Sequence, residues 1–407
     1  MNSLKEWGDE MRAFHVASDE EIKRGKTTDV YFARTKQILD VKKLSKANVV
    51  AEVTANDLPR GWPWSVLCGV DEVAKLFEGR SVDVYAMPEG SVFHPKDYRG
   101  MRMPAVVIEG PYGEFCELET PLLGLLCHAS GVATMAARLR KIVGTKFLMS
   151  FGIRRAHPAL APMLDRAAYI GGFDGVSSLV GAKAIGKEPM GTMPHSLVIA
   201  FGNQVKAWRA FDEVMPLDVP RIALVDTYFD EKIESLMAAE ALGKRLQGVR
   251  LDTPGSRKGD FTEIVREVRW ELDTRGYGHV KIMVSGGVND DNIRGLAEAG
   301  ADGFGVGTSL TNAPTIDFAM DIVELEGKPV AKRGKLGGSK RVWRCPKCLT
   351  NVLLPARASS PECPSCGGKT KQVLIPLIKK GKIAAKLPPV DEIRKRVLAQ
   401  LEKLGPI

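Results

Sequence analysis

Four cysteines near the C-terminus form the chemically most specific pattern in the sequence. They make two Cys-x-x-Cys pairs separated by 14 residues: Cys345, Cys348, Cys363 and Cys366. Each pair turns tightly enough to direct two thiolates at one centre, and four thiolates suit a tetrahedral metal site. Because such a site leaves no open position for water, we expect a structural Zn2+ held by four cysteines. An iron centre or a redox pair could use the same ligands.

A second group of chemically useful residues follows a series of short apolar runs: KFLMSFG, GGFDGVSS, HSLVIAFG, RIALVDTY, LQGVRLDT, VKIMVSGG and DGFGVGTS. The residues at or just after the ends of these runs are Arg154, Arg155, Ser177, Ser178, Asp226, Arg250, Asp252, Ser285, Gly286, Gly287, Gly305 and Gly307, and Thr192 and His195 lie beside a further run. In a parallel barrel the carboxyl ends of the strands converge on one face, where catalysis is placed. These residues are therefore predicted to line one site.

Glycines and a charged pair within this group indicate a phosphorylated small-molecule substrate. Gly286 and Gly287 end one run, and Gly305 and Gly307 end the next. Without side chains, these positions let backbone N–H groups approach an anion, and late strands of such barrels recurrently bind phosphate. Arg250 and Asp252 lie two residues apart, on one side of a strand. They suit a phosphate or carboxylate together with sugar hydroxyls.

The elements that must position these residues alternate between strand and helix. From Lys146 to Leu310 the apolar runs are separated by amphipathic, helix-like segments, which indicates parallel strands with crossovers. No G-x-G-x-x-G turn follows the first strand, so we expect a barrel and not an open dinucleotide-binding sheet. Leu122 to Val143 contains no proline and ends in a basic turn before Gly144, which predicts a helix.

We therefore predict an α/β protein: an irregular TIM-like α/β barrel with an N-terminal α+β sheet domain and a C-terminal zinc ribbon. Short β-rich runs punctuated by glycine and proline predict the sheet domain at 1–120. The barrel is expected at 121–330, and a zinc-ribbon segment with a terminal helix at 331–407. The first residues do not read as a signal peptide, and no stretch approaches about 18 consecutive apolar residues, so a cytoplasmic protein is expected.

The positive charge of the chain is concentrated in one region. The formal net charge is +9, but residues 331–390 contain 14 lysines and arginines and only one acidic residue, Glu362. The rest of the chain is mildly acidic. A basic zinc ribbon could contact a nucleic-acid backbone, so a nucleic-acid-binding protein is one alternative function. Aromatic residues for base stacking are few in this region, and we expect nucleic acid to be at most an accessory partner.

Five ordered motifs resemble nicotinate phosphoribosyltransferase, particularly its short members with a C-terminal zinc ribbon. The motifs are TDVYFART at 28–35, SFGIRRAH at 150–157, GGFDGVS at 171–177, GTMPHS at 191–196 and VRLD at 249–252. The resemblance covers residues 20–380. It implies formation of nicotinate mononucleotide and pyrophosphate from nicotinate and 5-phosphoribosyl-1-pyrophosphate. It also implies coupling to ATP hydrolysis with Mg2+, in NAD biosynthesis and salvage.

The resemblance also assigns roles residue by residue. His195 would be phosphorylated from ATP, and Asp252 would hold the ribose hydroxyls. Phe151 and Tyr31 would sandwich the pyridine ring, with the tyrosine reaching in from a second subunit, so a homo-oligomer of at least two chains is implied. The remaining assignments are Arg250 and Thr192 to the nicotinate carboxylate, Arg154 to phosphate or pyrophosphate, and Ser285, Gly286, Gly287, Gly305 and Gly307 to the site that seats the 5-phosphate.

One position bears on the choice of base. Relatives that use nicotinamide resemble the same pattern but have aspartate where this sequence has Ser177. An aspartate would accept the amide N–H and repel a carboxylate, whereas serine favours the acid. Quinolinate or nicotinamide phosphoribosyltransferase remains the alternative within the family. Another phosphate-binding barrel enzyme would leave the motifs around Tyr31 and His195 unexplained.

Overall fold

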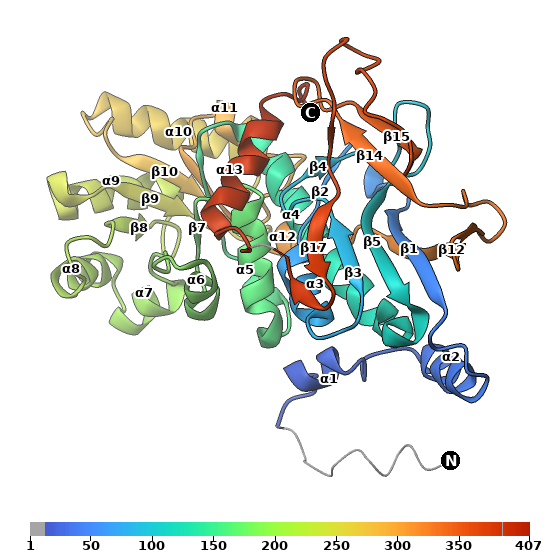
Figure 1. The fold of residues 1–407 in the computed structure, drawn as a ribbon. Coiled ribbons are helices and arrows are strands. Elements are labelled where there is room, and N and C mark those ends of the chain that lie inside the picture. Colours follow the sequence, from blue (N-terminus) through green and yellow to red (C-terminus); the bar gives the residue numbers. More distant parts are fainter. Residues whose placement is uncertain (1–12, 385) are drawn as a thin grey trace.

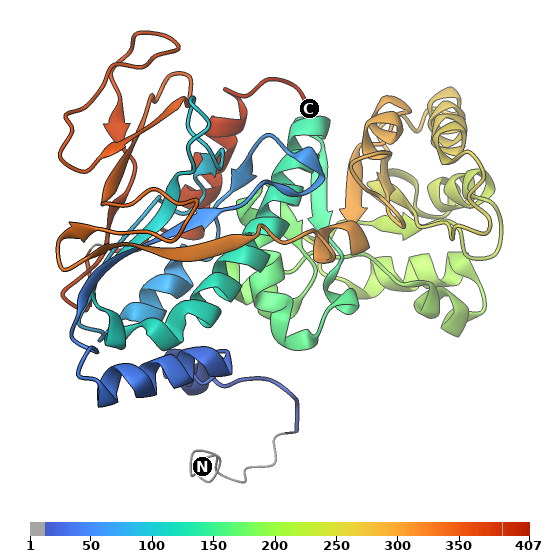
Figure 2. The same ribbon diagram turned by 90° about the vertical axis from the view of Figure 1, so that its right-hand side faces the viewer.

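The computed structural model describes residues 13–384 and 386–407 of the chain. Two sheets lie side by side, with a long helix between them (Figures 1 and 2). The antiparallel sheet combines strands from both ends of the chain, and the parallel sheet carries the strand ends that the sequence marks as functional. The predicted helix is confirmed: α4 runs over Glu119–Val143 and ends at Gly144, whose φ is 63°.

The antiparallel sheet has seven strands in the order β13-β12-β1-β5-β3-β17-β18. Their bounds are β1 Asn48–Ala55, β3 Asp83–Ala86, β5 Pro104–Pro111, β12 Phe318–Leu325, β13 Lys328–Pro329, β17 Ile375–Lys379 and β18 Lys382–Ile383. A separate two-stranded pair is formed by β2 Ser65–Val66 and β4 Val92–Phe93. Strands from both ends of the chain therefore build one sheet across the boundaries expected at residues 120 and 330. Those boundaries stay a prediction.

Strand β1 is buried along almost its whole length because it lies between β12 and β5. Its one acidic residue, Glu52, is 3% exposed, and Lys340 forms an ion pair with it at 3.0 Å. A buried carboxylate needs such a partner. The partner comes from the segment after the barrel, so the C-terminal region is fixed to the centre of the N-terminal sheet.

The parallel sheet is a curled half-barrel of six strands in the order β7-β6-β11-β10-β9-β8. The strands are β6 Phe147–Ser150, β7 Gly175–Val176, β8 Ile222–Leu224, β9 Gly248–Leu251, β10 Lys281–Val284 and β11 Gly303–Val306. Their helices are α5 Ala161–Ile170, α6 Leu179–Ile185, α8 Gln204–Val214, α9 Glu231–Leu242, α10 Phe261–Thr274, α11 Ile293–Glu298 and α12 Thr308–Thr311. The α/β prediction is confirmed, with an open sheet whose edge strands are β7 and β8.

One predicted strand is wrong. The run HSLVIAFG forms a helix, α7, over His195–Phe201. Pro194 precedes it and Gly202 ends it with a φ of 64°. Only Val198 is fully buried, whereas the side chains of Ile199 and Phe201 are 60% and 44% exposed. With one buried position in seven, the run lies on the surface as a short helix.

Helix α4 is the central helix of the fold. Residues 116–143 are long and apolar enough to satisfy a membrane-span criterion, but 67% of the most apolar window is buried inside the molecule. The helix packs against α3 (Val70–Phe77), α5, α11 and strand β12. A side chain at Gly131 would place its Cβ 2.4 Å from the carbonyl oxygen of Pro314, so glycine permits the close approach.

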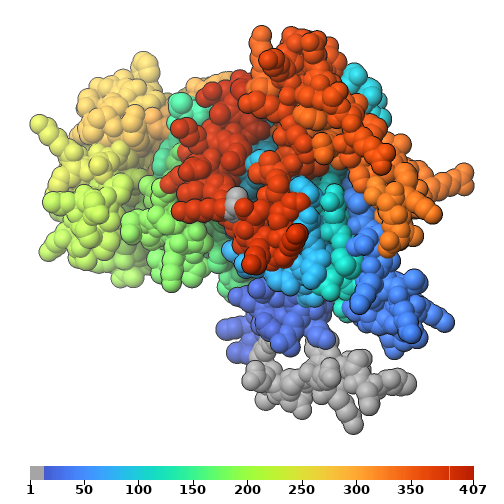
Figure 3. All heavy atoms as spheres, viewed as in Figure 1, coloured from blue at the N-terminus to red at the C-terminus, as the bar shows by residue number. Residues whose placement is uncertain are grey.

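The C-terminal region forms a small ribbon and a final helix. Strands β14 (Lys340–Arg344), β15 (Asn351–Pro355) and β16 (Lys371–Gln372) make a three-stranded antiparallel sheet. Helix α13 (Val390–Leu401) then packs on α4, α5 and β4 (Figure 1). At the other end of the chain, α1 (Asp19–Lys23) and α2 (Val30–Val41) lie below the antiparallel sheet (Figure 1), and their residues form the dark blue atoms in the lower part of the space-filling view (Figure 3).

Candidate active site

A cavity of about 570 Å3 lies at the carboxyl ends of the parallel strands. Twelve of the thirteen predicted catalytic and substrate-binding residues line it: Phe151, Arg154, Ser177, Thr192, His195, Arg250, Asp252, Ser285, Gly286, Gly287, Gly305 and Gly307. A wider cavity of about 1230 Å3 shares Arg154, His195 and Asp252 with it and extends past Asp226 and Lys258. The structure thus brings the predicted residues together, while the role of each stays a prediction.

Arg250 is the best-anchored cation of the site. It lies on β9 and is 8% exposed. Its guanidinium donates to Ser285 Oγ at 3.0 Å and to the Met193 carbonyl at 2.9 Å, and it lies 3.1 Å from Asp252 Oδ2. Its Nε is buried without a hydrogen-bond partner among the described residues. The guanidinium lies 5.9 Å from the centre of the Phe151 ring, so a fixed cation stands beside an aromatic face.

Asp252 and Ser285 extend this network towards the strand-end glycines. Ser285 Oγ donates to Asp252 Oδ1 at 2.9 Å, on the opposite carboxylate oxygen from Arg250. The Asp252 side chain remains 29% exposed. It is therefore oriented by two neighbours and still accessible to a ligand. Ser285 orients both charged groups at once because it accepts from one and donates to the other.

His195 is the first residue of α7 and faces three oxygen-bearing side chains. Its Nδ1 lies 3.1 Å from Thr227 Oγ1, whereas its Nε2 lies 3.6 Å from Asp226 Oδ1 and 3.9 Å from Asp252 Oδ2. Both ring nitrogens are thus near groups that could accept a proton or a hydrogen bond. These neighbours can orient the imidazole ring by hydrogen bonds at both nitrogens.

Asp226 is the buried carboxylate of this cluster. It is 3% exposed, and its Oδ2 accepts the backbone N–H of Asp252 at 2.6 Å. Its Oδ1 has no hydrogen-bond partner among the described residues and points to His195. Burial raises the pKa of Asp226 to about 6, partly opposed by that backbone N–H and by His195. Asp226 is therefore poised to change its charge near neutral pH.

The glycines differ in what they do. Gly286 and Gly287 both have a φ of 77° and are exposed to the cavity, so only glycine fits there without strain. Gly305 has a different reason to lack a side chain, because a Cβ there would lie 2.2 Å from the Phe151 ring. Gly305 thus makes room for the aromatic ring. Its contribution to a phosphate site stays a prediction.

Sequence reasoning missed several residues around the cavity. Asp226 was expected at a strand end, but its place beside His195 was not, and Thr227 was not considered. Lys258, in the loop before α10, donates from its Nζ to the Gly286 carbonyl oxygen. Burial lowers the pKa of Lys258, opposed by Asp252 and Asp226. That loop has no periodic pattern, so only the three-dimensional fold reveals this cation.

Tyr31 is the one predicted substrate-binding residue outside the cavity. It lies on α2, where 57% of its surface is exposed, and its hydroxyl donates to Asp29 Oδ2 at 3.3 Å. Val30, Ile38 and Val41 on the same helix are 60%, 60% and 71% exposed. Within one chain, Tyr31 does not reach the substrate cavity.

The four predicted metal ligands converge. The Sγ atoms of Cys345, Cys348, Cys363 and Cys366 all lie within 4.8 Å of one another. Cys345 lies 3.5 Å from Cys366, and Cys348 lies 3.5 Å from Cys363, and all four are free thiols. Four converging thiols are the donor set of a closed tetrahedral site. The residues fit a metal ion, and this four-cysteine cluster is a candidate metal centre.

Comparison with known proteins agrees with this site. The family described as quinolinate phosphoribosyl transferase, N-terminal domain, matches residues 29–130, and its C-terminal domain matches residues 132–321. Nicotinate phosphoribosyltransferase pncB2 of Mycobacterium tuberculosis is 36% identical over 279 residues, which are 64% of this chain and 57% of that protein. The chain thus spans less than two thirds of that relative. The Bos taurus nicotinate phosphoribosyltransferase is 28% identical over 82% of this chain and 77% of its own length.

Solved structures extend the likeness to more than nine tenths of the chain. A structure described as nicotinate-nucleotide pyrophosphorylase from Pyrococcus furiosus has 53% identity and a TM-score of 0.93, covering 97% of this chain and 99% of that one. Human nicotinic acid phosphoribosyltransferase has 21% identity and a TM-score of 0.71, over 93% and 94% of the two chains, and shows the shared fold. With both domain matches and with the strand-end cavity that its motifs line, the chain belongs to the family described as quinolinate phosphoribosyl transferase, and the curated relatives named above are nicotinate phosphoribosyltransferases.

Proposed function

We propose that this protein transfers the phosphoribosyl group of 5-phosphoribosyl-1-pyrophosphate to the ring nitrogen of nicotinate, releasing pyrophosphate. The setting of Arg250 is the observation that carries this proposal. A buried guanidinium with an unpartnered Nε lies 5.9 Å from the Phe151 ring centre. A planar aromatic acid needs such a pair, because its carboxylate pairs with the cation while its ring stacks on the aromatic face.

The sugar phosphate would occupy the neighbouring part of the cavity. Asp252 is accessible and oriented for the ribose hydroxyls, and the open glycines Gly286 and Gly287 suit the 5-phosphate. Departure of pyrophosphate leaves positive charge on the ribose, which a nearby carboxylate stabilises. The exposed Arg154 at the cavity wall would bind the leaving group together with Mg2+.

The choice of base follows from the charge around the ring position. Ser177 lines the cavity half-buried and brings no negative charge, so an acid is not repelled. Quinolinate is the second candidate base because Arg155 also lines the cavity and could serve a second carboxylate. Arg155 is exposed, however, whereas Arg250 is buried and fixed. We therefore favour the monocarboxylate nicotinate.

ATP coupling would pass through His195. A neutral ring nitrogen of His195 would attack the γ-phosphorus of Mg-ATP, the bond to the bridging oxygen would break, and ADP would leave. Asp226 and Asp252 would stabilise the positive ring through the N–H at the other nitrogen. Water would later release the phosphoryl group as inorganic phosphate and regenerate the histidine.

The metal and the oligomer complete the proposal. The four-cysteine cluster would hold a structural Zn2+, since four thiolates leave no position for catalysis. Tyr31 would stack on the pyridine ring in a partner's cavity, because its own helix α2 projects away and presents apolar side chains. The enzyme would act as a dimer or a higher homo-oligomer, in the cytoplasm, as a step of NAD biosynthesis.

The test is product formation from phosphoribosyl pyrophosphate with nicotinate, nicotinamide or quinolinate, with and without Mg-ATP. Wild type and His195→Ala are compared. Nicotinate mononucleotide formation that ATP stimulates only in the wild type would support both the base and the histidine role. Turnover with quinolinate but not with nicotinate would show that quinolinate is the base and would refute the choice of nicotinate. Nicotinate turnover that ignores both ATP and His195 would remove the coupling, and no turnover with any base would refute the proposal.

A further inference from the structure

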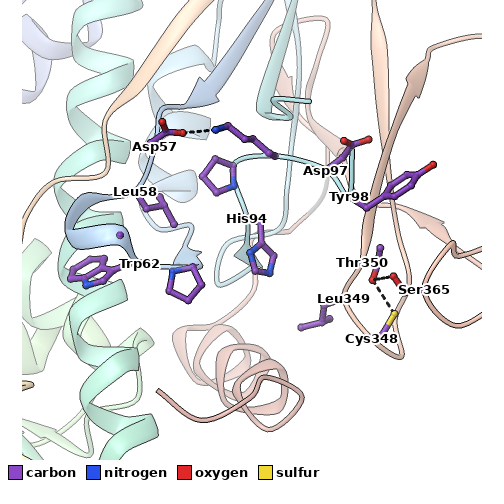
Figure 4. Close-up of a pocket in the computed structure, with 14 residues that line it drawn as sticks. Asp57, Leu58, Trp62, His94, Asp97, Tyr98, Cys348, Leu349, Thr350 and Ser365 are labelled. Carbon is purple, nitrogen blue, oxygen red and sulfur yellow. Dashed lines mark hydrogen bonds and ion pairs between the residues drawn. The ribbon is translucent and has the colours of Figure 1, made fainter. Parts of the chain in front are cut away.

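A second cavity, distinct from the substrate site, lies between the N-terminal sheet domain and the cysteine-bearing ribbon (Figure 4). Its volume is about 540 Å3, and it shares no lining residue with the substrate cavity. One wall comes from Leu58, Trp62 and His94, and the facing wall comes from Leu349 and Thr350 of the ribbon. Nothing in the proposed transferase reaction uses this space.

The walls of this cavity are held in place by hydrogen bonds across the two regions. The Tyr98 N–H donates to the Asn351 carbonyl at 3.3 Å, and the Leu353 N–H donates to Asp97 Oδ2 at 3.2 Å. The Arg99 guanidinium also donates to the Leu353 carbonyl. The cavity is therefore built into the contact between the ribbon and the sheet domain.

Aromatic and hydroxyl groups line it. Tyr98 lies at the rim of the cavity with its ring directed outward (Figure 4), 54% exposed, and the Arg99 guanidinium lies 5.2 Å from the ring centre. An exposed aromatic ring paired with arginine is a platform on which a nucleobase can stack. On the ribbon side, the hydroxyls of Thr350 and Ser365 lie 3.0 Å apart and can hydrogen-bond a sugar or a phosphate.

The charge around this cavity is positive. Lys347 immediately precedes the lining residue Cys348, is exposed, and forms no ion pair within the described part of the chain. Lys96 lines the cavity and pairs with Asp57 at 2.8 Å, while Arg99 pairs with the buried Asp97 at 3.0 Å. Farther along the ribbon lie the exposed cations Arg341, Lys369 and Lys371, and the segment contains a single acidic residue, Glu362. The two carboxylates at the cavity are thus neutralised by their own partners, and Lys347 remains available.

We propose that the rim of this cavity and the adjoining ribbon surface bind single-stranded nucleic acid, with one base stacked on the exposed Tyr98 ring at the rim and the neighbouring phosphate at Lys347. The proposal is independent of the transferase function. The negative charge of a phosphate backbone complements the positive charge of the ribbon, and an unpaired base can stack on the flat ring of Tyr98. RNA and DNA share this chemistry, and the 2′-hydroxyl distinguishes them at Thr350 and Ser365.

The test uses the full-length protein and fluorescein-labelled oligo-U and oligo-dT of about 12 nucleotides, followed by fluorescence anisotropy. The salt is varied from about 50 to about 200 mM. The variants are Tyr98→Ala and Lys347→Glu, with Lys382→Glu as the matched control. Lys382 is also an exposed lysine; it lies on β18, in the seven-stranded sheet, and does not line the cavity. Circular dichroism checks that each variant is folded, and nicotinate turnover checks that the separate substrate site is intact.

Tyr98→Ala is expected to weaken binding by between about fivefold and about a hundredfold, the range for loss of one stacked base. Lys347→Glu is expected to weaken binding and to reduce the slope of log affinity against log salt by about 0.7. Tighter binding of oligo-U than of oligo-dT would support recognition of RNA. Equal binding of the two would show that the protein recognises only the base and the phosphate. Absence of binding below about 100 µM at the lowest salt overturns the proposal. So does binding that Lys382→Glu weakens as much as Lys347→Glu while Tyr98→Ala has no effect.

Discussion

The carboxylate of Asp226 gives a quantitative prediction that separates stability from activity. Asp226→Asn removes the charge but keeps a carbonyl oxygen that can accept the Asp252 N–H, now 2.6 Å from Oδ2. The folded protein disfavours the ionised form, because burial raises the pKa of this side chain from 3.8 to about 6. A group whose pKa is raised on folding contributes its full stability below the unfolded value, and this contribution is lost as pH rises through the folded value.

The magnitude follows from the difference between the two pKa values. A rise in the pKa of Asp226 from 3.8 to about 6 lowers the free energy of unfolding of the wild type by about 3 kcal/mol at pH 7 and above. At pH 5 about half of that loss has occurred, because the unfolded chain is ionised and the folded chain is still mostly protonated. The Asn variant avoids the loss. Its advantage in the free energy of unfolding should therefore roughly double between pH 5 and pH 7 to 8, where it reaches about 3 kcal/mol.

Urea unfolding of wild type and variant at pH 5, 6, 7 and 8, at about 25 °C, measures this advantage as the difference between their free energies of unfolding in the absence of urea. Asp291→Asn is the control, because it removes the same charge from an exposed side chain in the loop before α11. We expect no comparable gain there. In parallel, Asp226→Asn should reduce ATP stimulation of nicotinate turnover, since a carboxylate 3.6 Å from His195 Nε2 is lost. A variant that is less stable at every pH, or whose advantage does not change with pH, would refute the reasoning.

Three further predictions concern the other parts of the molecule. Gly305→Ala should displace the Phe151 ring, since the new Cβ would lie 2.2 Å from it, and we expect a higher KM for nicotinate and a loss of about 1 to 3 kcal/mol in unfolding free energy. The control Gly124→Ala, at an exposed position inside α4, should leave the KM unchanged and raise the unfolding free energy by about 0.5 to 1 kcal/mol, because alanine favours a helix over glycine. Lys258→Ala should raise the KM for phosphoribosyl pyrophosphate more than that for nicotinate, because its Nζ lies at the Gly286 carbonyl; equal effects on both constants would contradict this placement. Metal analysis should find one Zn2+ per chain that Cys366→Ser releases, with a lower thermal midpoint of unfolding; an unchanged midpoint would show that the cluster does not stabilise the ribbon.

Local sequence patterns were enough to predict the site because parallel strands bring their carboxyl ends together. The lining residues that directly follow a strand include Phe151, Ser177 and Ser285. Arg250 lies one residue before the end of β9, so the position of each residue along the chain determines where they meet. The same logic failed at HSLVIAFG, whose apolar residues suit a strand as well as a short surface helix. Only the neighbouring elements decide between these states.

Two other features depend on contacts between distant parts of the chain. Lys258 reaches Gly286 from a loop without periodicity, and Asp226, which follows β8, meets His195 at the start of α7. The pairing of β12 and β17 with the N-terminal sheet likewise joins residues far apart in sequence. Such pairings need knowledge of which strand edge is open, and no single segment contains that information.

The place of β12 in the sheet affects how the chain folds during synthesis. Val49 on β1 pairs with Leu325 on β12, so one edge of β1 stays open until about 270 further residues have been made. At about 5 to 20 residues per second, this interval is roughly 15 to 55 s. During that time β1 presents unpaired backbone and apolar side chains, which is a hazard for aggregation. A nascent chain ending after α4 should therefore depend on chaperones, and the N-terminal segment expressed alone should not remain monomeric.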